Sequence, residues 1–174
     1  MTILGSRRWL AIGGALASLV ACAAQTTDNR EVVDPRPDRE TFPFVADLLV
    51  HRCGTLDCHG KVGRNLRLYG HEGLRLAGTD YPTAEPTTTV AEYDEDYLSI
   101  VTLEPEKMQA VIAEQGASPD RLTLVRKARG SEHHKAGTIW STSDKSDLCL
   151  TSWLAGHTDT AACLEGTAYK PTAK

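Results

Sequence analysis

Aromatic residues and positive charge are both scarce in this chain of 174 residues. Aromatic side chains make up only 6% of it and phenylalanine occurs twice, so a core must be built mainly from Leu, Val and Ala with the few Trp and Tyr residues. The formal net charge is −4, and it becomes −6 once the two positive charges of Arg7 and Arg8 in the leader are removed. This acidic balance argues against nucleic acid as a partner.

Long apolar runs are also absent. The stretch from Trp9 to Ala21 is too short for a transmembrane helix, which needs roughly 20 apolar residues, so we do not expect a permanent span. A Ser-His-Asp order, a phosphate-binding glycine loop and a paired-acid motif are missing as well, and we therefore do not expect an enzyme. The length suits one domain around one modest core.

The N-terminal residues have the pattern of an export leader. Arg7 and Arg8 precede the apolar run, and this pattern is typical of a signal peptide over residues 1–21. The closing letters LVAC resemble the lipobox of bacterial lipoproteins, which implies cleavage before Cys22 and acylation of that residue. Ala23 follows where lipoproteins of the inner membrane commonly have Asp, so the resemblance favours an outer-membrane lipoprotein of the cell envelope. The alternative is ordinary secretion with an incidental cysteine.

The rest of the chain divides into three parts. Residues 22–40 are polar and contain two prolines, which predicts a flexible tether. Residues 41–165 are predicted to form a small, loop-rich, all-α domain, and residues 166–174 a tail. Apolar spacing and the placement of Pro and Gly predict helices from Thr41 to near Cys53, Pro105 to Gly116, Ser118 to Gly130 and Ser143 to Gly156. Glycines interrupt residues 60–80, and an exposed loop is expected over 79–90.

Four cysteines remain after Cys22 is assigned to a lipid. In an oxidising compartment, thiols are expected to be paired, bound to metal or attached to a cofactor. Cys149 and Cys163 flank the end of the last predicted helix, and we expect them to form a disulfide that closes a 15-residue loop. The alternative is two unpaired thiols.

Cys53, Cys58 and His59 stand in the order Cys-x4-Cys-His. The spacing between the cysteines is two residues longer than in the usual Cys-x2-Cys-His haem attachment sequence. In that chemistry two thiols add to the vinyl groups of haem, and the histidine after the second cysteine becomes the proximal iron ligand. Gly54 is expected to give the longer loop its backbone freedom. The alternatives are a Cys53–Cys58 disulfide in a haem-free domain, and a zinc site with ligands from elsewhere.

Longer stretches then show a family resemblance. FVADLLVHRCGTLDCHG, at 44–60, and GRNLRL, at 63–68, resemble c-type cytochromes of the kind found in planctomycetes and myxobacteria. SPDRLTLVRKARGSEHHKAGTIW, at 118–140, and DLCLTSWLAG, at 147–156, resemble later parts of the same proteins. The resemblance implies a cytochrome c-like helical domain that carries one covalent haem c.

A six-coordinate haem needs a second axial ligand. The resemblance implies His134, because this residue occupies the turn that matches the family's histidine motif. Met108 is the alternative, since thioether ligation is common in small cytochromes, although a core role is equally natural for it. The other histidines of the mature chain are His51, His71, His133 and His157.

Two functions from different classes are compatible with these patterns. The first is a lipid-anchored electron carrier that receives an electron from one redox protein of the envelope and gives it to another. The second is a haem-free surface lipoprotein whose disulfide-stapled domain serves as a structural or interaction module. The basic cluster at 126–129 would either meet haem propionates or form a solvated helix face.

The leader yields the first testable prediction. Cys22 is expected to be the lipidated mature N-terminus, and Cys22→Ala should leave the chain unprocessed or move it from the membrane to the soluble fraction. Mass spectrometry of the N-terminal peptide from isolated membranes checks this. An unmodified terminus at another residue would contradict it.

Overall fold

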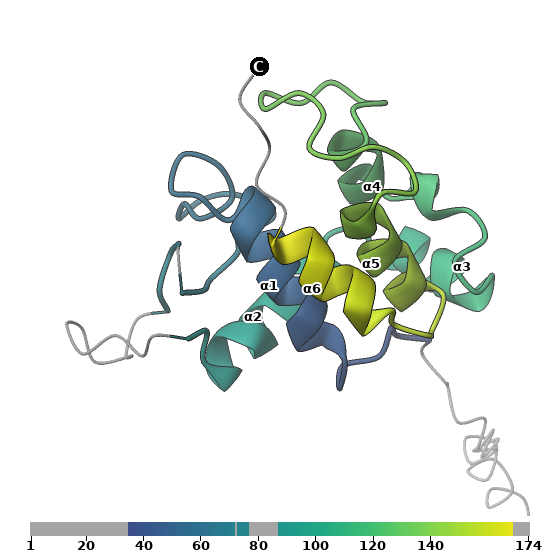
Figure 1. Cartoon of the computed structure of the whole chain (residues 1–174), viewed down its shortest axis with the longest axis horizontal. Helices are drawn as coiled ribbons and strands as arrows, with labels where there is room; N and C mark the ends of the chain where they lie inside the picture. The colour runs from purple at the N-terminus through teal and green to yellow at the C-terminus, as the bar shows by residue number, and fades with distance from the viewer. Residues whose placement is uncertain (1–34, 72, 77–86, 169–174) are drawn as a thin grey trace, which may run out of the picture. The chain divides into compact units, whose positions relative to one another are not determined.

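The computed structural model describes residues 35–71, 73–76 and 87–168. This described part of the chain folds into helices joined by loops and contains no strand, apart from an isolated bridge between Tyr69 and Leu74 (Figure 1). The helices are α1 (Phe42–Cys53), α2 (Val90–Val101), α3 (Pro105–Ala113), α4 (Thr123–Ala128), α5 (Lys145–Leu154) and α6 (Thr160–Ala168), with a short 3-10 turn, η1 (Pro119–Arg121). The prediction of a small all-α domain is confirmed.

Local signals explain where several of these helices begin. α1 and α3 both have proline in the first turn, where a missing N–H costs nothing. α2 begins with a capping box: the Thr89 side chain accepts a hydrogen bond from the Glu92 amide, and the Glu92 carboxylate accepts one from the Thr89 amide. In α5 the Asp144 side chain accepts a hydrogen bond from the Asp147 amide.

Three elements differ from the sequence-based expectation. α2 and α6 were not predicted, although the Thr-x-x-Glu box before α2 is a recognisable start signal. The helix expected between Ser118 and Gly130 is divided into η1 and α4, because Leu122 adopts an extended conformation between them. The loop expected over 79–90 lies mostly outside the described residues, and Val90 already belongs to α2.

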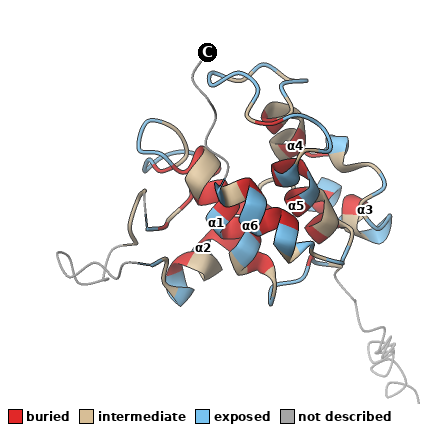
Figure 2. Cartoon of the chain, in the orientation of Figure 1, coloured by how far each residue is buried: buried red, intermediate tan, exposed pale blue. Residues whose placement is uncertain are grey.

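α1 supplies more of the buried core residues than any other helix, and it packs against α2, α5 and α6. Figure 2 shows its buried surface beneath α6. Phe42 lies between two other aromatic side chains, with ring centroids 5.3 Å from Tyr97 and 5.2 Å from Trp153. These rings supply the large apolar surface that a chain with few aromatics needs in one place. Because Cys53 is the last residue of α1, this packing also places the first cysteine of the motif.

The folded domain extends beyond the predicted limits of 41–165 at both ends. The Tyr97 hydroxyl donates a hydrogen bond to the Pro37 carbonyl (2.8 Å), and the Trp153 indole N–H donates one to the Asp38 carbonyl (2.6 Å). The end of the predicted tether is therefore held against the core, because it satisfies two buried donors. α6 continues to Ala168. The predicted signal peptide, Cys22 and most of the tether lie outside the described residues, as do the last six residues of the tail.

Cys149 of α5 and Cys163 of α6 form a disulfide, the pairing expected from the sequence. Both cysteines are buried, and α5 and α6 pack closely along their length. None of the helices in the described part is both long enough and apolar enough to cross a membrane.

Removing the disulfide is expected to lower the free energy of unfolding by about 3 kcal/mol, because the unfolded chain regains the entropy of a 15-residue loop. Urea denaturation of the double variant Cys149→Ala and Cys163→Ala measures the loss. The native protein should lose the same amount when reduced, whereas the double variant should not respond to reductant. Equal stability of the oxidised native protein and the double variant would contradict this prediction.

Candidate functional site

A cavity of about 450 Å³ opens beside the end of α1. Residues from five separate segments line it, among them Cys53, His59, Leu66, Lys127 and His134. An adjoining hollow of about 350 Å³ shares His59, Lys127 and His134 with the cavity and adds Cys58. Both volumes fall within the roughly 300–1,000 Å³ typical of ligand and cofactor sites.

The imidazole rings of His59 and His134 lie beside each other in this cavity. Their centroids are 6.0 Å apart and their planes differ by 26°. His59 follows α1, whereas His134 belongs to the loop between α4 and α5, so only the fold brings them together. Two imidazoles that bind one metal atom from opposite sides, through bonds of about 2 Å, have their ring centres roughly 6 Å apart. The observed separation matches that arrangement.

His59 is held in one tautomer. Its Nδ1 lies 2.9 Å from the carbonyl oxygen of Leu66, and because a carbonyl can only accept, Nδ1 carries the proton. Burial lowers the pKa of His59, and the positive charges of His134, Arg64 and Lys127 act in the same direction, against the hydrogen bond to Leu66. The ring is therefore neutral at neutral pH, and Nε2 keeps a free lone pair. This is the usual arrangement of a metal-binding histidine whose other nitrogen is fixed by a second partner.

His134 presents a buried nitrogen that has no protein partner. Its Nδ1 is inaccessible to solvent and has no hydrogen-bond partner among the described residues. A buried polar nitrogen without a partner costs free energy unless a ligand or water satisfies it. The residue lines the cavity, but this nitrogen is not open to the cavity itself.

Cys53 and Cys58 are both free thiols in the structure, although Cys149 and Cys163 are bridged. Burial raises the pKa of Cys53 to about 12, so this residue stays a neutral thiol at neutral pH. A cysteine binds zinc as the thiolate, and no group of three or more His, Cys, Asp or Glu side chains in the described part is arranged to hold a metal ion. The disulfide and zinc alternatives therefore gain no support from this arrangement.

Glycine is required both in the loop between the two cysteines, at Gly54, and just after it, at Gly60. Gly54 has φ −80°, which any residue can adopt, so it is needed for close packing and not for its φ: a Cβ there would lie 2.6 Å from the Val50 carbonyl oxygen. A Cβ on Gly60 would lie 2.0 Å from the Gly54 carbonyl oxygen, far inside van der Waals contact. The loop closes tightly through hydrogen bonds from the Cys58 and Gly60 amides to the Thr55 carbonyl, which accommodates the long spacing.

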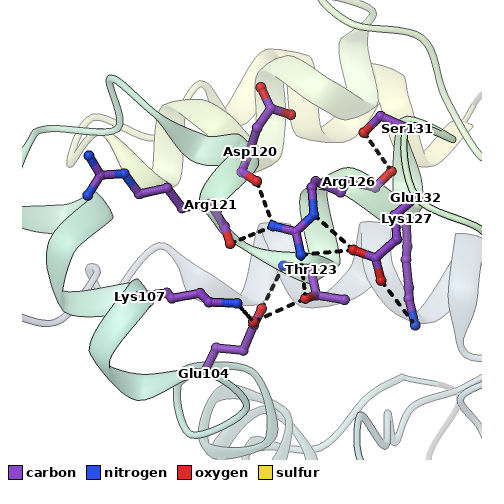
Figure 3. Close-up of polar contacts among 9 residues, drawn as sticks. All are labelled: Glu104, Lys107, Asp120, Arg121, Thr123, Arg126, Lys127, Ser131 and Glu132. Atoms are coloured by element: carbon purple, nitrogen blue, oxygen red, sulfur yellow. Dashed lines mark hydrogen bonds and ion pairs between the residues drawn. The ribbon is translucent and has the colours of Figure 1, made fainter.

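A polar network holds α4 against the cavity wall (Figure 3). The Glu104 carboxylate accepts hydrogen bonds from the Thr123 amide (2.6 Å) and hydroxyl (3.0 Å), at the start of α4. Arg126 pairs with Glu132 at 2.8 Å, and Glu132 also lies 3.8 Å from the Lys127 ammonium. Glu104, Thr123 and Lys127 all line the cavity. The network therefore determines where the Lys127 ammonium lies along the cavity wall.

The other ligand candidates lie elsewhere. Met108 is 4% exposed and packs in the hydrophobic core, and it does not line the cavity. His51 and His71 line a different hollow, and His157 is exposed. His133 lines only the adjoining hollow. Of the candidate distal ligands, His134 is therefore the one that the fold brings to His59.

Sequence reasoning did not identify the carbonyl of Leu66 or the carboxylate of Glu104 as parts of the site. A backbone acceptor leaves no signal in a sequence, and Glu104 acts on a residue 19 positions away. The described residues thus bring two histidines and two free cysteines to one pair of adjoining hollows. No family model, no curated protein and no solved structure matches this chain.

Proposed function

We propose that the chain is a lipid-anchored c-type cytochrome that carries electrons between redox proteins of the cell envelope. Cys53 and Cys58 would hold one haem c covalently, His59 would be the proximal ligand and His134 the distal ligand. The observation that carries this proposal is the facing pair of imidazoles, 6.0 Å apart, in a cavity that also contains the Cys53 side chain.

Each of these residues fits its role. The thiols are unpaired and therefore available for thioether bonds, and Cys58 directly precedes His59 in the chain. His59 is neutral, with its Nδ1 occupied by Leu66, and His134 lines the same cavity beside it. A disulfide-stapled interaction module requires neither the paired histidines nor the cavity that they line.

Haem c, when bound, supplies reversible one-electron chemistry at its iron. The chain's own residues hold it and control its surroundings. Leu66, Leu103 and Ile139 line the cavity and exclude water from it, which affects the reduction potential. Arg64 and Lys127 supply positive charge at the same wall, where the carboxylates of a haem would be neutralised. No bond of a substrate is made or broken, so we assign no catalytic residue.

The location follows from the leader and not from the folded domain. Cys22 in the lipobox-like LVAC sequence would attach the chain to the outer membrane through a lipid, and residues 22–36 would separate the anchor from the domain. The Cys149–Cys163 disulfide suits an oxidising compartment such as the periplasm or cell surface.

Covalent haem is expected on the peptide that contains Cys53 and Cys58. The chain should be produced with the periplasmic haem-attachment machinery, and a pyridine haemochrome spectrum and the peptide mass should be measured. The double variant Cys53→Ala and Cys58→Ala should carry no covalent haem. A native peptide without haem mass, from protein isolated out of its own envelope, would refute the cytochrome proposal and leave the stapled module.

The two histidines are expected to separate attachment from ligation. His59→Ala should abolish the stable low-spin spectrum, whereas His134→Ala should retain covalent haem but become high-spin, because one axial ligand is lost.

Met108→Leu is the matched control for these variants. This swap conserves volume in the core and should cost less than about 1.5 kcal/mol of stability. It should leave the absorption spectrum unchanged. A far-red sulfur-to-iron band that disappears in Met108→Leu would instead identify Met108 as the distal ligand.

A further inference from the structure

A short backbone segment, residues 66–69, lies between His59 and α2. On one side, the Leu66 carbonyl accepts the hydrogen bond from His59 Nδ1, and the Leu68 amide donates to the His59 carbonyl, both at 2.9 Å. On the other side, side chains of α2 accept hydrogen bonds from the backbone amides of Arg67 and Tyr69. The segment therefore joins the candidate proximal ligand to a helix that does not line the cavity wall at His59.

Asp96 and Ser99 are the α2 residues that hold this segment. The Asp96 Oδ1 accepts a hydrogen bond of 2.7 Å from the Tyr69 amide, and the Ser99 hydroxyl accepts one of 3.0 Å from the Arg67 amide. Asp96 is 0% exposed, and its second oxygen, Oδ2, is buried without a hydrogen-bond partner among the described residues. Burying a carboxyl group that has only one hydrogen-bond partner costs free energy, which suggests that Asp96 has a role beyond packing.

The groups around Asp96 make its negative charge unfavourable. Burial raises its pKa to about 8, the hydrogen bond from Tyr69 opposes this, and the charges of Glu92, Glu95 and Asp47 add to it. Glu92 and Glu95 belong to α2 itself and Asp47 belongs to α1. Among the described residues, Tyr93 of α2 also interacts with the Asp96 charge, Arg67 and Tyr69 belong to the segment itself, and Arg75 pairs with Glu92. Asp96 is therefore protonated when the pH is below about 8 and ionised when the pH is above it.

We propose that Asp96 is a positioning residue for His59, acting through the Tyr69 amide and the backbone of residues 66–69 on the hydrogen bond between His59 Nδ1 and the Leu66 carbonyl. This inference rests on the proposed function, in which His59 is the proximal ligand of the iron. Asp96 itself touches neither His59 nor the cavity.

The direction of the effect follows from charge. Ionised Asp96 is a stronger acceptor for the Tyr69 amide than the neutral acid, and it adds a buried negative charge behind the ligand. A negative charge favours the oxidised iron, which is more positive than the reduced iron. The midpoint potential should therefore fall as the pH rises through about 8.

The test compares Asp96→Asn with Glu95→Gln in the full-length haem-loaded protein. Both variants replace a carboxyl by an amide on α2, but Glu95 is exposed and has no hydrogen bond to the segment. The native protein and Glu95→Gln should both show a potential that falls between pH 6 and pH 10. Asp96→Asn should lose this pH dependence and stay at the value of the protonated native protein. An equal slope in Asp96→Asn and the native protein, or no slope in the native protein, would overturn the proposal.

A second readout does not require iron chemistry. In NMR titrations the Tyr69 amide and the ring nitrogens of His59 should shift together with the ionisation of Asp96, and both shifts should vanish in Asp96→Asn. Ser99→Ala removes the other anchor and should change the His59 resonances without removing the titration. If the chain proves to carry no haem, the cytochrome proposal fails while this coupling remains measurable. If Tyr69 titrates and His59 does not respond, the positioning role fails by itself.

Discussion

The hydrogen bond between His59 Nδ1 and the Leu66 carbonyl is the contact on which the candidate site depends. It selects the tautomer, keeps the Nε2 lone pair free and turns the ring toward His134. A second hydrogen bond, from the Leu68 amide to the His59 carbonyl, closes the loop that follows the second cysteine. Without the bond to Leu66 the His59 ring would be free to rotate, and the Cys-x4-Cys-His motif would not determine which way the ring points.

The site combines one rigid wall with several irregular ones. α1 is buried against α2, α5 and α6, so Cys53 at its end occupies a position that the core determines. His59, Leu66 and His134 lie on loops, which fixed polar contacts hold in place. The disulfide adds to the rigid side, because it ties α5 to α6 behind α1. The position of Cys53 therefore depends on the packing of the core, whereas the positions of His59 and Leu66 depend on a few hydrogen bonds.

Buried acids are the second constraint on this small domain. Glu92 and Asp147 are buried, and each forms an ion pair with an arginine, Arg75 and Arg129 respectively. Both carboxylates also accept hydrogen bonds from backbone amides. Asp96 differs, since one of its oxygens has no partner in the described part. The contrast matters because a domain with a modest core has little stability to spare for an unsatisfied carboxyl group. Asp96 is also the residue of α2 that accepts the hydrogen bond from the Tyr69 amide, in the segment 66–69 that contacts His59.

The amino-acid sequence by itself determined the features that depend on near neighbours. Proline and glycine positions and apolar spacing predicted α1, α3 and α5, and the cysteine count predicted the Cys149–Cys163 disulfide. The sequence did not predict α2 or α6. The amphipathic pattern of α6 is weak, whereas α2 is clearly amphipathic and begins with a capping box, so the start of α2 was readable from the sequence.

The tertiary structure alone decided the contacts between distant segments. It placed His134 beside His59 and buried Met108 in the core. It also brought Asp96 to the Tyr69 amide and the end of the supposed tether to Trp153. The reason is physical: helix signals act over a few residues, whereas these contacts depend on how several helices share one core, and no short stretch of sequence contains that information.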